Sequence, residues 1–317
     1  MLIHIPFFYL CPLKTTQTYH SNGKLLLTGE YLVLQGAQAL AVPAQFGQSL
    51  QISPIKQNLL QWESYTNRGS VWFAKDFALP LRTNRNSTDS IEILLLKILQ
   101  QAQNQNPNFL KDNQGYKVQT QLEFPNDWGL GSSSTLLNNI AQWAQIDAFT
   151  LLENTMGGSG YDIACAQNNS PIIYQKTATK RLIQSIAFLP DFKEQLYFVH
   201  RNQKQKSAAE ITRFNTLNKD FSVEIQAVSE ITQLLIKSTA LDDFEKLLLE
   251  HEKIISHVIQ KQPVQELLFK DYFGQIKSLG AWGGDFILAT GNEDTPTYFQ
   301  KKGYNTVLLY EQMILKE

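Results

Sequence analysis

A glycine- and serine-rich turn that leads directly into a helix is the feature that most constrains this chain. The stretch 124–134 contains Gly129, Leu130 and Gly131 followed by three serines, and the pattern of 135–149 is typical of a helix. Glycine permits backbone angles and close approaches that a Cβ atom would block. Serines at a helix start cap it and direct several N–H groups at one point, where the helix dipole favours an anion. The turn therefore predicts a phosphate-binding loop, with an ordinary capped helix as the alternative.

Three further glycine-containing segments occur in order around this turn. They are Ser21–Gly36 with its Gly-Lys and Gly-Glu-Tyr, Gly157–Ala164 with Gly-Ser-Gly-Tyr-Asp, and Lys277–Asp285. Together with the turn, they resemble the motifs of the GHMP kinases, the superfamily of galactokinase, homoserine kinase, mevalonate kinase and phosphomevalonate kinase. One such motif alone is weak evidence for the family, but the ordered set is strong evidence and spans nearly the whole chain. The details look most like the mevalonate and phosphomevalonate kinase branch.

The order of predicted elements favours an α+β fold, because strands and helices are mixed without strict βαβ alternation. We expect strands at 24–34 (strand, turn, strand), 39–52, 61–73, 116–124, 195–200, 286–290 and 306–310. We expect helices at 88–104, capped by Thr88 or Asp89, and at 135–149, 207–218, 223–238, 241–261 and 295–302. The resemblance implies two lobes. An N-terminal ATP-binding lobe, residues 1–180, would be similar to the second domain of ribosomal protein S5, and a C-terminal lobe, 181–317, would be ferredoxin-like.

Bulk composition is that of a soluble globular protein and excludes several function classes. The chain has 317 residues, 43% hydrophobic and 18% charged, with a formal net charge of −1. The short basic run Lys204–Lys206 is read as a solvated loop, so we expect no nucleic-acid partner. The apolar start Leu2–Leu13 contains two prolines, is too short to span a bilayer and does not resemble a signal peptide. We expect no membrane association and, with only two cysteines, a cytoplasmic location.

Phosphoryl transfer needs phosphates held in line, their charge neutralised, and an oriented nucleophile. The resemblance implies ATP and Mg²⁺ as cofactors and assigns ATP binding to the loop residues Gly129, Leu130, Gly131, Ser132, Ser133 and Ser134. Ser133 is the predicted Mg²⁺ ligand, with Glu153 as a second candidate. The loop is not a Walker A motif, because no lysine follows its glycines.

Two residues are predicted to act in catalysis. Asp162 matches the aspartate of the family's Ser-Gly-x-Asp motif, a general base or an electrostatic orienter of the acceptor hydroxyl. Lys24 matches the lysine of the first motif, and would hold Asp162 ionised and stabilise the transferring phosphoryl group. Without the other motifs, Asp162 would be a helix cap and Lys24 a surface lysine at a strand edge.

The acceptor pocket is predicted from the first, third and fourth motifs. The residues assigned to it are Glu30, Tyr31, Tyr161, Gly280, Ala281, Gly283 and Gly284. Trp282 stands where a glycine is usual, which requires ordinary backbone angles there. It either closes the cleft or stacks on a substrate or base, or it only fills the interface between the lobes. His251 and His257 lie on a polar helical stretch and are expected at the surface.

The sequence therefore predicts an ATP-dependent kinase for a small-molecule acceptor, either mevalonate or phosphomevalonate. A phosphate acceptor would need extra cations, for which Arg201, Lys204 and Lys206 are candidates. Two alternatives remain: a non-catalytic sensor of ATP or a metabolite with the same fold, and a diphosphomevalonate decarboxylase. The motifs do not fix the acceptor, and a homodimer is left open.

Overall fold

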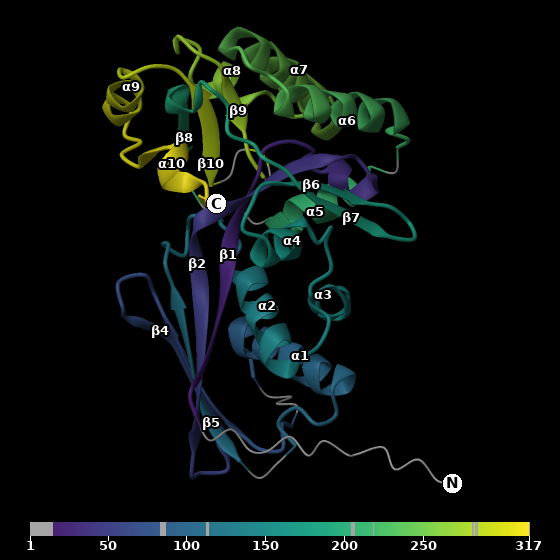
Figure 1. Ribbon diagram of the computed structural model, residues 1–317, viewed down its shortest axis with the longest axis vertical. Coiled ribbons are helices and arrows are strands. Elements are labelled where there is room, and N and C mark those ends of the chain that lie inside the picture. The colour runs from purple at the N-terminus through teal and green to yellow at the C-terminus, as the bar shows by residue number, and fades with distance from the viewer. Residues whose placement is uncertain are drawn as a thin grey trace. The chain divides into compact units, whose positions relative to one another are not determined.

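The computed structural model (Figure 1) describes residues 15–82, 87–111, 114–203, 207–217, 219–280, 282 and 285–316, without the side chains of 207–209. The apolar start Leu2–Leu13 lies outside these residues. The chain divides into two compact units. The first unit contains residues 1–20, 49–122 and 136–156, and the second contains 21–48, 123–135 and 157–317. The predicted lobe boundary near residue 180 stays a prediction.

Helices and strands are mixed along the chain, as an α+β fold requires. The strands are β1 (Gln17–Leu26), β2 (Ala39–Ile55), β3 (Leu59–Tyr65), β4 (Val71–Ala78), β5 (Gly115–Leu122), β6 (Ile172–Lys176), β7 (Arg181–Ser185), β8 (Leu196–His200), β9 (Ile276–Ser278), β10 (Phe286–Thr290) and β11 (Val307–Leu309). The helices are α1 (Ser90–Gln105), α2 (Ser132–Ala144), α3 (Ala148–Thr155), α4 (Tyr161–Gln167), α5 (Ser207–Asn215), α6 (Ser222–Ile236), α7 (Leu241–Ile259), α8 (Val264–Leu268), α9 (Thr295–Lys301) and α10 (Tyr310–Met313). Two short 3₁₀ helices are η1 (Leu32–Gln35) and η2 (Lys193–Gln195).

In the first unit, β3 pairs antiparallel with β4 and parallel with β5. Alternate residues of β3, including Leu60 and Trp62, are fully buried, which explains the period-two pattern of its sequence. Helix α1 begins where the Asp89 carboxylate accepts a 2.8 Å hydrogen bond from the Ile91 N–H, so one of the two predicted caps is confirmed. Figure 1 shows α1 and α3 on the same side of these strands.

The second unit contains a four-stranded antiparallel sheet in the order β11-β8-β10-β9. The three-residue strand β9 is paired so that Lys277 lies opposite Leu288 of β10. Helices α6 and α7 pack together, and α7 also contacts β9. The apolar stripe of α7 is buried, with Phe244, Leu248 and Ile255 at most 1% exposed. This packing fixes the ends of β9 and β10, between which the fourth motif lies.

Two sequence predictions in the second unit need correction because the chain turns more sharply than its apolar residues suggest. The segment after Thr28-Gly29-Glu30 is not a strand: it forms the 3₁₀ helix η1, which follows positive φ angles at Gly29 (86°) and Tyr31 (61°). Trp282 also has a positive φ, 47°, where ordinary angles were expected. It is 3% exposed and packs with Tyr31 and Phe214 in a hydrophobic cluster, so it fills part of the core of the second unit.

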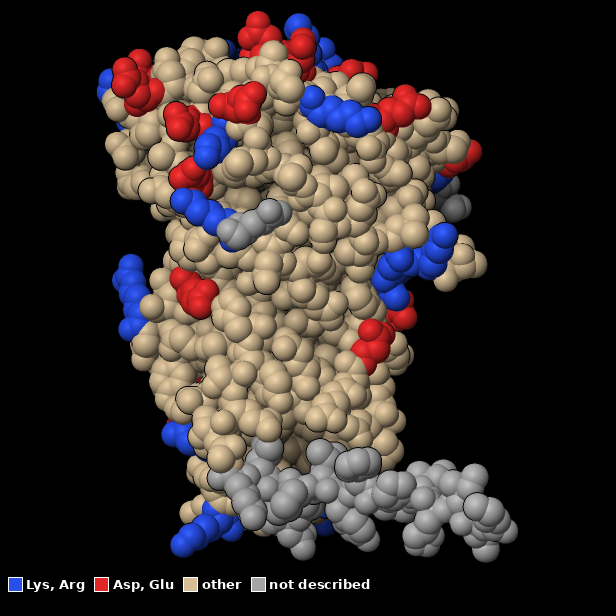
Figure 2. Space-filling view, viewed as in Figure 1, with Lys and Arg blue, Asp and Glu red and all other residues tan. Residues whose placement is uncertain are grey.

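The predicted helix 135–149 is in fact two helices. Gln145, with φ 56°, follows the end of α2, and the Asp147 carboxylate accepts a 2.7 Å hydrogen bond from the Thr150 N–H at the start of α3. Among the described residues, no helix is both long and apolar enough to cross a membrane. On the face drawn in Figure 2, basic and acidic side chains are interspersed, and broad areas carry neither.

Candidate active site

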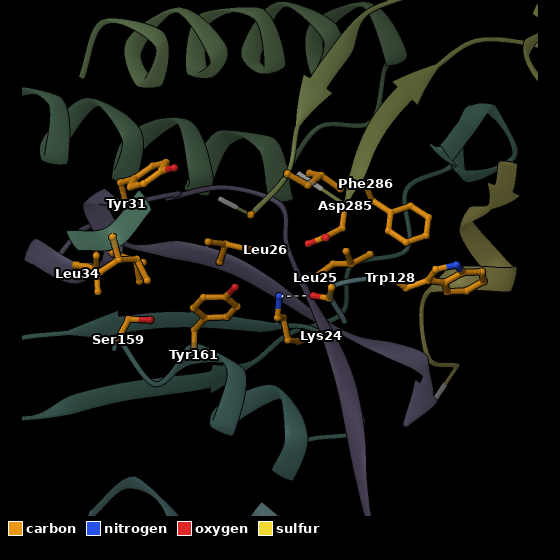
Figure 3. Close-up of a pocket in the computed structure, with 15 residues that line it drawn as sticks. Lys24, Leu25, Leu26, Tyr31, Leu34, Trp128, Ser159, Tyr161, Asp285 and Phe286 are labelled. Atoms are coloured by element: carbon orange, nitrogen blue, oxygen red, sulfur yellow. Dashed lines mark hydrogen bonds between the residues drawn. The ribbon is translucent and has the colours of Figure 1, made fainter. Parts of the chain in front are cut away.

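A pocket in the second unit brings together residues from the four sequence motifs (Figure 3). Its polar lining comes from Lys24 of β1, Tyr161 of α4, Ser159 and Asp285. Leucines of β1 and η1 supply much of the apolar wall, with Trp128 and Phe286 close together at one side. The site is therefore a largely apolar cavity with a few convergent polar groups, as is usual for small-molecule pockets.

Lys24 is tied to the glycine-rich loop through both its backbone and its side chain. Its N–H donates to the Leu130 carbonyl at 3.0 Å, and its Nζ donates to the Gly129 carbonyl at 2.8 Å. Burial favours the neutral amine, but the interactions of the amine with Tyr161, Asp162 and Asp285 outweigh it and raise the pKa of Lys24 above its ordinary value. The lysine is therefore charged at neutral pH and is held beside the loop.

Two glycines of the loop are required by its geometry. Gly129 and Gly131 have φ angles of 63° and 89°, in the left-handed region that favours glycine. A Cβ atom at Gly131 would lie 3.2 Å from Cγ of Lys24, and one at Gly129 would lie 1.8 Å from Oδ2 of Asp285. The loop thus allows Lys24 and Asp285 to approach its backbone more closely than any other residue type would.

The serines form the first turn of α2, which begins at Ser132, three residues before the predicted start at Thr135. The Gly131 carbonyl accepts hydrogen bonds from the Ser134 and Thr135 N–H groups, each at 3.0 Å. Ser133 is exposed and Ser132 half-buried, whereas Ser134 is 5% exposed. N–H groups at a helix start lack partners within the helix, so this turn fits an anion such as a phosphate.

Asp162 and Tyr161 lie in the first turn of α4, which follows Gly160 in a left-handed conformation (φ 92°). The Ser134 hydroxyl donates a hydrogen bond to Oδ2 of Asp162, which links the two glycine motifs. The Tyr161 ring lies 5.8 Å from Nζ of Lys24. Burial, opposed by Lys24, raises the pKa of Tyr161 to about 12, so the phenol is neutral and its hydroxyl carries a proton at neutral pH. Half-buried Asp162 is not among the residues that line the pocket.

Asp285, the last residue of the fourth motif, lines the pocket but was not among the residues predicted for the site. Its backbone carbonyl accepts a 2.9 Å hydrogen bond from the Arg201 N–H. Figure 3 shows its carboxylate and the Lys24 ammonium group directed toward one another across the pocket. The signal was present in the sequence, because Asp285 follows two glycines directly before a strand, a place where functional side chains are often held.

Glu30, predicted to contact the substrate, is instead part of a buried polar cluster next to the pocket. Its side chain is 0% exposed and pairs with Nζ of Lys277, which also donates to the Ser278 carbonyl at 2.9 Å. Glu252 accepts from both the N–H and the hydroxyl of Ser278. Burial raises the pKa of Glu30 to about 6 and that of Glu252 to about 7, despite the charge of Lys277.

His251 was expected at the surface, and that prediction is wrong. It is 0% exposed on α7, and its Nε2 accepts a 3.0 Å hydrogen bond from the Gly29 N–H. Burial, together with the nearby charge of Lys277, lowers the pKa of His251 well below 6.5, so the ring is neutral. The 3.4 Å approach of Nε2 to Glu30 is therefore not an ion pair. His257 is exposed, as expected.

The remaining predicted site residues fall into three groups. Tyr31 and Gly280 line the pocket, and Leu130 is buried in the loop. Ala281, Gly283 and Gly284 lie outside the described residues. Glu153 is exposed on α3, in the first unit rather than in the unit that holds the pocket.

Within the described parts of the chain, no three His, Cys, Asp or Glu residues are grouped so that they could hold a metal by themselves. Mg²⁺ in phosphoryl-transfer sites is held by one or two carboxylates together with substrate phosphates. Asp162 and Asp285, whose charges both act on Lys24, supply carboxylates of this kind. The residues present therefore fit a metal that arrives with its nucleotide.

Comparison with solved structures identifies the fold. Methanococcus jannaschii mevalonate kinase superposes with a TM-score of 0.70 at 14% identity, over 96% of this chain and 100% of that chain. The fold is that of the GHMP kinases. Streptococcus pneumoniae phosphomevalonate kinase in complex with phosphomevalonate and AMPPNP gives 0.66 at 16% identity, over 92% and 98% of the two chains. Lactococcus lactis galactokinase complexed with galactose gives 0.66 at 12% identity, over 95% and 94%.

The predicted α+β, two-lobed GHMP kinase fold is confirmed by these superpositions. Neither a family model nor a curated protein matches the sequence. At these identities the likeness shows the fold alone, so activity has to be argued from the site.

Proposed function

We propose that this protein is a kinase that transfers the γ-phosphoryl group of ATP to a small-molecule acceptor, with mevalonate and phosphomevalonate as the first candidates. One observation carries the proposal: Lys24 is held charged between the carbonyl of Gly129 and the groups Tyr161, Asp162 and Asp285, beside the first turn of α2. A fixed cation next to an anion-binding helix start is what a transferring phosphoryl group requires.

The residues present fit ATP and assign a role to each part of the site. The Gly129–Ser134 loop would hold the nucleotide phosphates through its backbone N–H groups, because its glycines leave no Cβ in the way. Lys24 would offset the charge that develops on the transferring group. Asp162, which accepts a hydrogen bond from the Ser134 hydroxyl, would help to keep Lys24 protonated. When bound, Mg²⁺ would neutralise phosphate charge, and Asp162 and Asp285 would be its protein ligands.

The pocket favours a small acceptor that has both apolar and hydroxyl groups. Leu26, Val33 and Ile211 supply apolar contacts, and Ser159 and Tyr161 offer hydrogen-bonding groups. A phosphate acceptor would need further cations. Arg201 does not line the pocket and is 8% exposed, and Lys204 and Lys206 are outside the described residues.

The test is ADP release from Mg·ATP, coupled to NADH oxidation, with mevalonate, phosphomevalonate, galactose or homoserine as acceptor. Lys24→Met keeps the length of the side chain and removes its charge. We expect it to lower kcat/KM by about 10²- to 10³-fold, the usual effect of losing one preorganised electrostatic group.

Lys302→Met is a matched control for this variant. Like Lys24, Lys302 has a carboxylate and a tyrosine ring nearby: its Nζ donates a 2.9 Å hydrogen bond to Asp271 and lies 5.1 Å from the ring centre of Tyr298. Lys302 does not line the pocket. Its activity should equal that of the wild type. ATP binding without turnover of any acceptor would favour the sensor alternative, and release of CO₂ from diphosphomevalonate would favour the decarboxylase.

A further inference from the structure

The second unit contains another cavity, separate from the candidate active site. Its wall is formed by Pro171 before β6, the segment 187–189 after β7, Lys193 of η2, and residues in and directly after α10. It shares no lining residue with the pocket that contains Lys24. Its volume of about 340 Å³ equals that of roughly eleven water molecules at ~30 Å³ each, so it has room for a ligand of about ten non-hydrogen atoms.

The buried part of the cavity wall is apolar and fixed in place. Phe188, Tyr310 and Ile314 line it and are each at most 5% exposed. The Tyr310 hydroxyl donates a hydrogen bond to the Phe188 carbonyl, and the centres of their rings lie 6.2 Å apart. Ile314 forms a β-bridge with Ala44. Because the tyrosine hydroxyl is already bonded within the protein, this part of the wall suits an apolar group.

The more exposed part of the same wall carries two cations and one anion. Nζ of Lys193 lies 2.6 Å from Oε1 of Glu311, and Nζ of Lys316 lies 3.1 Å from Oε2 of the same carboxylate. The hydrogen bond between them raises the pKa of Lys193 and lowers that of Glu311, so both are ionised at neutral pH. Glu194 also acts on Lys193 but does not line the cavity. The charged groups of the wall therefore favour an anion.

The Glu311 carboxylate shows which kind of head group the two lysines accept. Each of its oxygens faces one ammonium group, so the spacing of the lysines fits a bridging carboxylate. The side chains of Lys193, Glu311 and Lys316 are 26%, 45% and 64% exposed, and ion pairs at such exposure contribute little to stability. A carboxylate that arrives with an apolar chain can therefore share the lysines with Glu311 or replace it at small cost.

We propose that this cavity is a second ligand site, which binds a small amphipathic carboxylate. The apolar chain of the ligand lies against Phe188, Tyr310 and Ile314, and its carboxylate lies on Lys193 and Lys316. The inference goes beyond the proposed kinase function and does not depend on it, because the two cavities have no lining residue in common.

The test is isothermal titration calorimetry of the full chain with three probes that differ in one property each. Octanoate has about ten non-hydrogen atoms, the size that the cavity volume allows. Hexanoate should bind about fifteenfold more weakly, because each buried methylene group contributes about fourfold to affinity. Octylammonium keeps the chain and reverses the charge, so it should bind at least about tenfold more weakly than octanoate.

Four variants locate the bound octanoate. Lys193→Met should weaken its binding about fivefold and Glu311→Gln should strengthen it about fivefold, the effect of one unit charge about 4 Å away in water. Leu189→Asp places a negative charge on a cavity residue that is 66% exposed, and it should weaken binding at least about tenfold without harm to the fold. Leu182→Asp is the matched control: Leu182 is 43% exposed on β7 and does not line the cavity, so binding should equal that of the wild type.

Several results would overturn the proposal. Octanoate binding that is lost in Lys24→Met but kept in Lys193→Met would place the ligand in the candidate active site instead. Equal binding of octylammonium, weaker binding to Glu311→Gln, or no binding at about 10 mM octanoate would exclude a carboxylate site in this cavity. Light scattering that finds a dimer, with Leu189→Asp a monomer, would show that a second copy of the chain covers the cavity. None of these results bears on the kinase function, which the ADP-release assay tests separately.

Discussion

Replacing Lys277 by methionine tests the buried polar cluster beneath the pocket. Lys277 is 0% exposed and pairs with the carboxylate of Glu30, which is also 0% exposed. Methionine fills nearly the same volume but leaves the carboxylate without a cation. Breaking a buried pair in this way costs about 3–5 kcal/mol of unfolding free energy, because the remaining charge is buried without compensation.

The loss of unfolding free energy in Lys277→Met should depend on pH, because it depends on the ionisation of the Glu30 carboxyl. Its pKa is raised in the fold from 4.5 to about 6, so its contribution to stability is complete below about pH 4.5 and is lost as pH rises through about 6. In the wild-type protein this amounts to about 2 kcal/mol. Without Lys277 the pKa of Glu30 rises further. Above pH 6 the variant therefore continues to lose about 1.4 kcal/mol of unfolding free energy for each pH unit, whereas the wild-type protein does not.

Urea unfolding at pH 5 and at pH 8, followed by far-UV circular dichroism, measures both effects. The deficit of Lys277→Met relative to wild type should be small at pH 5 and reach about 3 kcal/mol at pH 8, from two pH units at about 1.4 kcal/mol each. The double variant Glu30→Gln/Lys277→Met should recover part of it, since no charge is then left buried. Lys302→Met, which breaks an exposed ion pair with Asp271, is the control and should change stability little. A deficit at pH 8 below about 1 kcal/mol, or one equal at both pH values, would refute the reasoning.

Three further predictions follow from individual contacts. Gly129→Ala should cost about 1–2 kcal/mol of unfolding free energy, because alanine is strained in the left-handed conformation. It should raise the activation free energy for kcat by at least as much, because its Cβ would displace the Asp285 carboxylate. Unchanged kinetics would contradict this. Histidine ¹⁵N NMR should find His251 neutral at pH 6, with its proton on Nδ1, because Nε2 accepts from Gly29 and burial lowers the pKa of the ring well below 6.5. The depressed pKa also means that stability is lost only as pH falls below 6.5. A charged ring at pH 6 would be inconsistent with the buried geometry. Trp282→Ala should cost about 3–5 kcal/mol and Trp282→Gly about 1 kcal/mol less, since glycine tolerates the positive φ angle; the reverse order in thermal unfolding would rule out backbone strain at this residue.

Local rules were sufficient for much of the fold. The period-three-and-four apolar stripe of α7 and the alternation in β3 were readable because each records which face of one element is buried. The cap at Asp89 was readable because a cap and its helix are adjacent in sequence. The glycine–serine turn likewise indicated an anion-binding helix start, because the conformational freedom of glycine and the open N–H groups at a helix start are local properties.

The composition of the site was decided only by tertiary structure. Sequence patterns cannot show which buried polar group finds which partner, since that depends on segments far apart in the chain. Glu30 was expected in the pocket but is paired with Lys277 from β9, and polar His251 is buried because it accepts from the Gly29 backbone. Asp285 joins Lys24 only because Gly129 has no side chain to keep it away. The sequence thus determined the loop and helix start that we expect to bind phosphate, and long-range packing decided which carboxylate lines the cavity.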